Sequence, residues 1–229
     1  MEEVQVYLFT GFLDAGKTKF IRETLQDKRF NDKEPTLLLV CEEGEEEYEP
    51  DAPYMKNVTI RTLGDMSEFN EENLKRLTAE AKATKVVVEY NGMWMLNDFY
   101  QLMPEEWVVY QEMMFADANT IESYNANMRN LVYDKMSSCE LVIFNRCKKD
   151  VDKDALHKLV RAISRKTDIA YEYTDGTAES IVTDSSWEVT LQGNYRKACL
   201  YDGEIYDASA GLEAVSWKHA DATRLPFHP

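Results

Sequence analysis

Short apolar runs alternate along this chain with longer stretches in which apolar residues recur at helical spacing. A continuous apolar run such as that at residues 36–40 is typical of a strand that is buried on both faces. Strands that alternate with helices predict βαβ units, and therefore a three-layer α/β fold with a mainly parallel sheet and helices on both faces. The predicted strands are residues 4–9, 36–40, 85–89, 107–115, 140–144 and 168–173, and the predicted helices are residues 17–30, 67–84 with Ser67 as the cap, 120–136 and 151–166.

The pattern changes from about Asp175 towards the C-terminus. Residues 187–191, 195–201 and 204–206 are short alternating runs, separated by turn signals at Gly193 and Gly203. This pattern predicts an antiparallel β-hairpin or meander appended to the α/β core. We therefore expect one domain at residues 1–181 and a C-terminal β extension and tail at residues 182–229. The stretch after Ser216 has no clear periodicity and reads as a tail or as the stub of a longer protein.

Composition narrows the class of partner. The chain has 229 residues, of which 26 are Lys or Arg and 42 are Asp or Glu, so its net charge is −16. Such an acidic chain repels nucleic acid and anionic membrane surfaces at long range. It contains no apolar run long enough for membrane insertion, begins with an acidic segment, and has four cysteines (Cys41, Cys139, Cys147 and Cys199) that form no C-x-x-C pair. We expect a cytoplasmic protein with reduced thiols.

The strongest motif follows the first predicted strand. Residues 11–18 read Gly-Phe-Leu-Asp-Ala-Gly-Lys-Thr and match the phosphate-binding pattern G-x-x-x-x-G-K-[ST] in full. In such a P-loop, backbone N–H groups and the helix N-terminus cradle phosphate oxygens, the lysine reaches the β- and γ-phosphates, and the hydroxyl ligates Mg²⁺. The expected nucleotide-binding residues here are Gly11, Asp14, Ala15, Gly16, Lys17 and Thr18. The alternative, a glycine turn with an exposed lysine, is disfavoured because the motif and its context agree.

A second acidic group is needed to hold the cation or its waters. Glu89 ends the predicted strand at residues 85–89, and Gly92 follows it in the pattern Glu-x-x-Gly. Glu89 is therefore expected to act in catalysis and in metal binding, and Gly92 to let its backbone N–H approach the γ-phosphate. The alternative is a glutamate that merely faces solvent at the end of a strand.

An acidic run follows the second predicted strand, with seven acidic residues between Glu42 and Asp51. The carboxyl end of a strand is where α/β sheets place their ligands, and carboxylates suit hard cations. The run as a whole reads best as a solvated charged loop, although a role in a switch stays open. Glu42 and Glu45 are individual candidates, and we assign Glu42 to the metal site with Thr18 and Glu89.

The base-binding segment is less well defined. Guanine-binding GTPases carry Asn-Lys-x-Asp after the corresponding strand, where the aspartate accepts hydrogen bonds from guanine. This chain has Asn145 and Arg146 but Lys148 at the aspartate position. Asp150 and Asp152 could substitute only if the loop takes another path. Asn145 and Arg146 are the predicted base contacts, and GTP against ATP stays open.

In this order the motifs resemble those of the CobW-type P-loop GTPases, relatives of the urease and hydrogenase accessory GTPases. The resemblance covers residues 4–181. The family pattern G-F-L-G-A-G-K-T is similar to residues 11–18, and Asn-Glu-Phe-Gly-Glu is similar to residues 41–45, with Glu42 and Glu45 aligned with its two glutamates. Glu-x-x-Gly is matched by residues 89–92, and Val-Asp-Ala is similar to residues 116–118. Asn-Lys-x-Asp corresponds to residues 145–148 and is matched at Asn145 only. The family's Cys-x-Cys-Cys metal motif is missing near residues 61–67, and its C-terminal domain is not recognisable in residues 188–229.

The resemblance implies a Mg²⁺-dependent GTPase that cleaves the β–γ phosphoanhydride bond and acts on a partner protein, with a homodimer as one option. Lys17 would offset charge on the β–γ bridge, and Glu89 would orient the metal waters or the attacking water. A metal-delivery role is not implied, because the thiolate motif is missing. Two rival hypotheses stay open: a non-hydrolysing, nucleotide-dependent interaction module and, ranked last, a small-molecule kinase.

Overall fold

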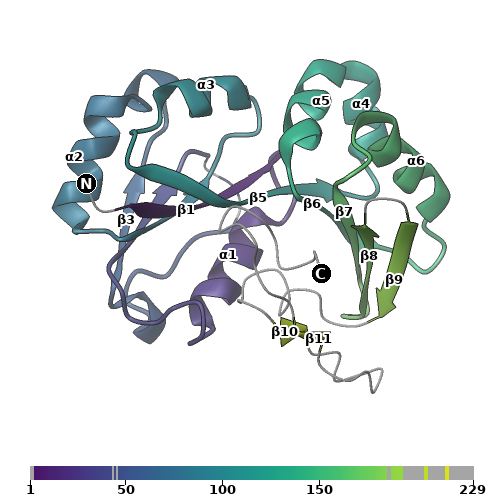
Figure 1. Cartoon of the computed structure of the whole chain (residues 1–229), viewed down its shortest axis with the longest axis horizontal. Helices are drawn as coiled ribbons and strands as arrows, with labels where there is room; N and C mark the ends of the chain where they lie inside the picture. Colours follow the sequence, from purple (N-terminus) through teal and green to yellow (C-terminus); the bar gives the residue numbers. More distant parts are fainter. Residues whose placement is uncertain are drawn as a thin grey trace. The chain divides into compact units, whose positions relative to one another are not determined.

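The computed structural model describes residues 3–42, 44, 46–184, 187–192, 204–205 and 215–216. The chain divides into two compact units, Met1–Glu112 and Met113–Pro229, and each is described by itself (Figure 1). Within the described residues, no helix is both long and apolar enough to cross a membrane. The candidates Glu45 and residues 195–201 lie outside the part of the chain that the structure describes.

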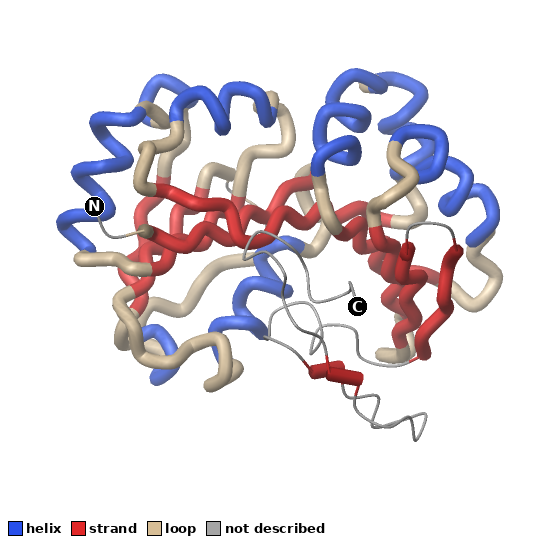
Figure 2. Tube along the Cα trace, viewed as in Figure 1, coloured by secondary structure: helices blue, strands red, loops and turns tan. Residues whose placement is uncertain are grey.

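The first unit is built on a parallel sheet (Figure 2). Its strands lie in the order β3-β2-β4-β1. They are β1 (Val4–Gly11), β2 (Thr36–Val40), β3 (Val58–Thr62) and β4 (Lys85–Glu89). Glu89 lies opposite Phe9 of β1 on one side and Val40 of β2 on the other. Because all these strands run in one direction, their carboxyl ends meet at the same edge of the sheet.

Helices cover both faces of this sheet. They are α1 (Lys17–Gln26), α2 (Glu71–Ala81) and α3 (Leu96–Leu102), with short 3₁₀ turns η1 (Pro53–Met55) and η2 (Met66–Glu68). Leu74 of α2 and Phe99 of α3 join the apolar cluster that includes Leu8. The next residue of β1, Phe9, points to the opposite face and packs against Phe20 of α1. Figure 1 shows α2 and α3 on one side of the strands and α1 on the other.

The second unit continues from β5 (Trp107–Asp117), which begins in the first unit. Its further elements are α4 (Ile121–Asn127), α5 (Arg129–Ser138), β6 (Leu141–Cys147), α6 (Lys153–Ile163), β7 (Asp168–Tyr173), β8 (Ala178–Asp184) and β9 (Trp187–Gln192). β5, β6 and β7 are parallel neighbours, whereas β8 and β9 add antiparallel strands beyond β7. β10 (Glu204–Ile205) and β11 (Val215–Ser216) form a separate antiparallel pair. The predicted α/β class with a C-terminal antiparallel hairpin is confirmed.

Several element boundaries differ from the sequence prediction. The helix predicted from Ser67 begins at Glu71, because the side chain of Asn70 accepts the capping bond from the Asn73 N–H, while Ser67 lies in η2. The single helix predicted at residues 120–136 is two helices, interrupted by the non-helical backbone of Met128. The first helix ends at Gln26, four residues before its predicted end at residue 30.

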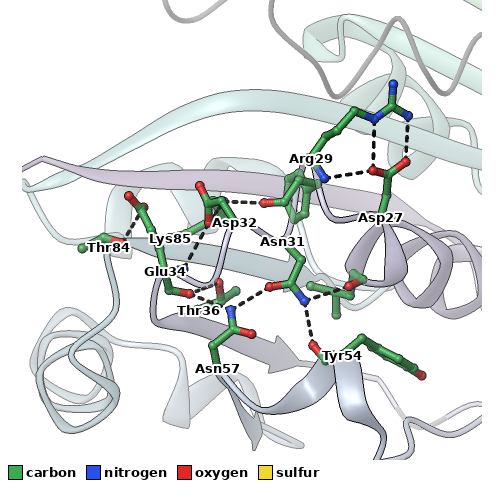
Figure 3. A network of polar contacts seen from close by, with 12 residues as sticks. Asp27, Arg29, Asn31, Asp32, Glu34, Thr36, Tyr54, Asn57, Thr84 and Lys85 are labelled. Atoms are coloured by element: carbon green, nitrogen blue, oxygen red, sulfur yellow. Dashed lines mark hydrogen bonds and ion pairs between the residues drawn. The ribbon is translucent and has the colours of Figure 1, made fainter.

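A polar network fastens the amino-terminal edge of the first sheet (Figure 3). The buried Lys85 ammonium donates to the Phe30 carbonyl over 2.7 Å and lies 3.3 Å from Asp32. Asn31 donates to the carbonyls of Leu25 and Tyr54. These bonds tie the chain after α1 to η1 and to the start of β4. The residues that match the phosphate-binding pattern lie at the other edge of the sheet, where β1 ends at Gly11.

Candidate functional site

The phosphate-binding motif forms a turn between β1 and α1. Gly11 and Gly16 have φ values of 129° and 95°, and Asp14 adopts the left-handed region with a φ of 56°. The Ala15 N–H donates to the Phe12 carbonyl over 3.2 Å, which closes the turn. Gly16 is the N-cap of α1 and supplies no side-chain cap. The first-turn N–H groups of α1 thus have the free-donor arrangement that binds anions at helix N-termini.

Lys17 points back over this turn and is 3% exposed. Its ammonium donates to the carbonyl oxygens of Gly11 (2.8 Å) and Phe12 (2.9 Å) and to Glu42 Oε2 (2.7 Å). A lysine ammonium has three N–H donors, so these bonds engage all of them. Glu42, which was predicted as a cation ligand, therefore forms an ion pair with Lys17, the residue expected to bind the phosphates.

Thr18 and Glu89, both predicted as cation ligands, are joined by a hydrogen bond. The Thr18 hydroxyl donates to Glu89 Oε1 over 2.6 Å, and the Tyr48 hydroxyl donates to Glu89 Oε2 over 2.7 Å. Glu89 is 3% exposed, so the alternative of a solvent-facing glutamate is wrong. Burial raises the pKa of Glu89 above its ordinary value, although the bonds from Thr18 and Tyr48 and the nearby Lys17 charge oppose this.

Tyr48 and Cys41 lie beside the same carboxylate. Burial, reinforced by the charge of Glu89, raises the pKa of the Tyr48 hydroxyl and of the Cys41 thiol. Both groups are therefore neutral at ordinary pH. Sequence reasoning missed Tyr48. Its only signal was an aromatic residue inside the acidic run.

Gly92 lies against the backbone of the phosphate-binding turn. A Cβ atom at Gly92 would stand 2.7 Å from the Gly11 carbonyl oxygen and 2.8 Å from the Phe12 Cα. The neighbouring Asn91 amide donates to the Cys41 carbonyl over 3.0 Å. Close packing against the motif thus explains a glycine at this position, whereas its predicted contact with a γ-phosphate stays a prediction.

The predicted base contacts belong to the second unit. Arg146 has a φ of 55°, and its guanidinium donates to Asp117 Oδ2 over 2.9 Å. Asn119 donates from its backbone and side-chain nitrogens to Asp117 Oδ1, each over 2.8 Å, and the Asn145 carbonyl accepts from the Ala118 N–H. Asn145 and Arg146 are therefore joined to residues 117–119 at the carboxyl ends of β5 and β6. Asp117 and Asn119 were not chosen from the sequence as site residues.

Asp117 is held as a carboxylate. Burial raises its pKa, but hydrogen bonds from Asn119 and the Arg146 guanidinium outweigh burial, so that the net pKa lies below the ordinary value of 3.8. Asp152, one of the two possible substitutes for the missing guanine-reading aspartate, instead caps α6 by accepting from the Ala155 N–H over 3.0 Å. Asp150 is exposed and is therefore the remaining candidate to replace the missing guanine-reading aspartate.

Within the described residues, no group of three or more His, Cys, Asp or Glu side chains is arranged to hold a metal ion. This finding leaves room for Mg²⁺, which commonly uses one or two protein oxygens and takes its other ligands from water and phosphate. Among the described residues, Cys41, Cys139 and Cys147 are buried and are not joined in disulfides.

The fold has relatives among solved structures. The chain is similar to the Zn(II)-bound YjiA GTPase from E. coli, with a TM-score of 0.52 and 16% identity over 74% of this chain and 57% of that one. A triple mutant of YjiA gives the same TM-score and identity over 75% and 58% of the two chains. This chain has the fold of a P-loop GTPase. It spans less than two thirds of the length of these relatives.

Another relationship covers the C-terminal part. The profile of the alpha-L-rhamnosidase N-terminal domain family matches residues 148–228. An alpha-L-rhamnosidase of Formosa agariphila is 46% identical over 43 residues, which are 19% of this chain and 4% of that protein. The matched range includes β7, β8 and β9 and begins inside the predicted domain at residues 1–181.

Proposed function

We propose that this chain binds a Mg²⁺–nucleoside triphosphate, with GTP as the nucleotide, and hydrolyses the β–γ phosphoanhydride bond. The observation that carries the proposal is the meeting of Thr18 and Glu89 at 2.6 Å, beside a buried Lys17. Residues 11–18 would cradle the phosphates, and Lys17 would offset charge on the β–γ bridge. Glu89 would orient the attacking water or the waters of the cation.

The side chains at this point suit a hard divalent cation. Thr18 Oγ1 and Glu89 Oε1 are oxygen donors at the mouth of the phosphate turn, the ligand type that Mg²⁺ prefers. When bound, the cation would supply positive charge against the β- and γ-phosphate oxygens. The protein's part is to hold these two oxygens, keep Glu89 buried and align the phosphates along the first turn of α1.

For the base, we propose that Asn145 and the stem of Arg146 contact guanine. The bonds among Asp117, Asn119 and Arg146 support this role because they keep that edge of the second unit in one arrangement. By resemblance to accessory GTPases, we further propose that the chain acts on a partner protein. A metal-delivery role is not part of the proposal, since residues 61–67 contain no cysteine where the Cys-x-Cys-Cys motif would fall.

Calorimetric titration with GTP and then ATP, each with Mg²⁺, tests the proposal. We expect tight binding of GTP, weaker binding of ATP and slow release of phosphate. Lys17→Ala should abolish binding, whereas Lys19→Ala, which removes an exposed lysine from the same helix, should leave it unchanged. Unaltered affinity in Lys17→Ala would disprove the assignment of residues 11–18. Equal affinity for ATP would show that the guanine site is lost.

A non-hydrolysing interaction module is the alternative. The contacts of Glu42 with Lys17 and of Tyr48 with Glu89 favour it, because they tie the acidic run to the groups that would bind nucleotide. Single-turnover measurement separates the two functions. Binding of Mg²⁺–GTP without phosphate release over hours supports the module, and release within minutes supports the GTPase.

We propose a second function for the C-terminal part, carried by the profile match at residues 148–228. These residues would belong to an accessory domain of a carbohydrate-acting protein and would bind an α-L-rhamnoside. Titration of the full chain with methyl α-L-rhamnoside, with methyl β-D-glucoside as control, tests it. Saturable binding of the rhamnoside alone is the expected result, and equal or absent binding of the two sugars contradicts it.

A further inference from the structure

Two groups on the acidic run engage the two halves of the proposed site. Glu42 accepts from the Lys17 ammonium over 2.7 Å, with side-chain exposures of 11% and 3%. Tyr48 donates to Glu89 over 2.7 Å. Glu42 therefore contacts Lys17, which is expected to bind the anionic phosphates, and Tyr48 contacts Glu89, which is expected to bind the cation.

Protein groups already engage both halves in this arrangement. The donors of Lys17 are all engaged, so an entering phosphate must replace one acceptor. Glu42 is the acceptor that an anion competes with most directly, because the two carry the same charge. On the other side, Thr18 donates to one oxygen of Glu89 and Tyr48 donates to the other, so a cation that draws on Glu89 competes with both hydroxyls for the charge of the carboxylate.

The two contacts are linked through the chain. Glu42 and Tyr48 lie on one short connection after β2, where a Cβ atom at Gly44 would stand 3.6 Å from Asp14 Oδ1. Glu46 on the same connection lies 3.4 Å from Arg22 of α1. Release of Glu42 alone would leave this connection held at Tyr48, and release of Tyr48 alone would leave it held at Glu42.

From this geometry we infer that Glu42 and Tyr48 are specificity-determining residues that make the site select an anion and a divalent cation together. The inference rests on the proposed function and concerns the same site. A metal-free triphosphate would have to displace Glu42 while lying beside two uncompensated carboxylates, Glu42 and Glu89. With a divalent cation, Glu89 would have a counter-charge that weakens its bond from Tyr48, and the cation would also offset the repulsion between the triphosphate and Glu42.

The test is calorimetric titration of the full chain with GTP, once with Mg²⁺ and once with EDTA. Wild type should bind metal-free GTP far more weakly than Mg²⁺–GTP. Glu42→Gln removes the competing charge and should strengthen metal-free binding about tenfold, the effect of one charge-assisted hydrogen bond. Tyr48→Phe removes only the hydroxyl and should lower the Mg²⁺ concentration for half-maximal GTP binding about tenfold, the effect of one hydrogen bond to a charged group.

Matched controls come from the same region. Glu47→Gln removes one exposed negative charge from the acidic run, and Tyr54→Phe removes a hydroxyl from η1. Both should behave as wild type, which separates the specific contacts from general electrostatics. Unchanged thermal unfolding of each variant shows that the fold is kept.

The outcomes separate the inference from the proposed function. If wild type and both variants bind Mg²⁺–GTP but Glu42→Gln keeps the wild-type preference for the metal complex, the inference fails and the proposed function stands. If Glu42→Gln instead weakens Mg²⁺–GTP binding, Glu42 is a cation ligand and the inference is again overturned. If no form of the protein binds Mg²⁺–GTP, the proposed function and the inference fail together.

Discussion

The hydroxyl of Thr18 donates a 2.6 Å hydrogen bond to Glu89, a residue 71 positions further along the chain. Parallel pairing sets Phe9 of β1 opposite Glu89 at the end of β4. The turn at residues 11–16 then places the start of α1, which carries Thr18, beside the end of β4. The bond therefore joins the two parts of the proposed site through the sheet. It makes Glu89 a test of the whole assignment.

Glu89→Gln should abolish hydrolysis with little loss of folding. Loss of a group that positions the water or the cation is expected to slow phosphate release at least about a hundredfold. Because Glu89 is buried, the neutral amide removes a buried charge while keeping the shape. Phosphate release and thermal unfolding are the measurements. Glu80→Gln, exposed on α2, is the control, and normal turnover in Glu89→Gln would contradict the role.

Gly92→Ala should disturb the phosphate turn. The added Cβ would stand 2.7 Å from the Gly11 carbonyl oxygen, so the backbone of one segment must move. We expect a loss of about 1–3 kcal/mol in the free energy of unfolding, as in other overpacked sites, together with weaker GTP binding. Gly64→Ala meets nothing within 4 Å and should be nearly neutral. Denaturant unfolding of Gly92→Ala and Gly64→Ala checks this prediction. Equal free energies of unfolding would show that the backbone of the turn moves to accommodate the added Cβ without cost.

Asp14→Gly should strengthen both the fold and the binding of nucleotide. Asp14 has a φ of 56°, which glycine adopts without the steric cost of about 1 kcal/mol. The change also removes a negative charge from the phosphate turn. Lys33→Gly, at a φ of 75°, gives the same backbone relief away from the turn. Both variants should unfold at a higher denaturant concentration than wild type, but only Asp14→Gly should bind GTP more tightly. Titration of each variant with denaturant and with Mg²⁺–GTP tests the two expectations.

Asp117 should make stability depend on acid pH. Its pKa in the folded chain is below the ordinary value of 3.8, so the unfolded chain binds the proton more readily. The stabilisation from the charged Asp117 is therefore fully present above about pH 3.8 and is lost as the pH falls through the lowered folded pKa. Unfolding curves of wild type and Asp117→Asn should differ at neutral pH and converge in acid. Parallel curves at every pH would contradict this, and Asp150→Asn is the exposed control.

Much of the fold was readable from local pattern. The strands at residues 36–40, 85–89 and 168–173 match their predicted bounds, because continuous apolar runs reflect burial on both faces. β3 and β8 were missed because their runs mix polar with apolar residues, so that pairing decides them rather than hydrophobicity. The helix at residues 120–136 divides at Met128, an interruption that the apolar spacing did not signal.

The sequence by itself determined the turn at residues 11–18 and the acidic residue that ends a buried strand, because each is a short pattern that favours one kind of backbone. Tertiary structure alone decided the partners. Glu42 lies on Lys17, Tyr48 bonds to Glu89, and Asp152 caps α6. Such contacts depend on strand register and on the path of the chain between strands, and these follow from packing between distant segments rather than from any local pattern.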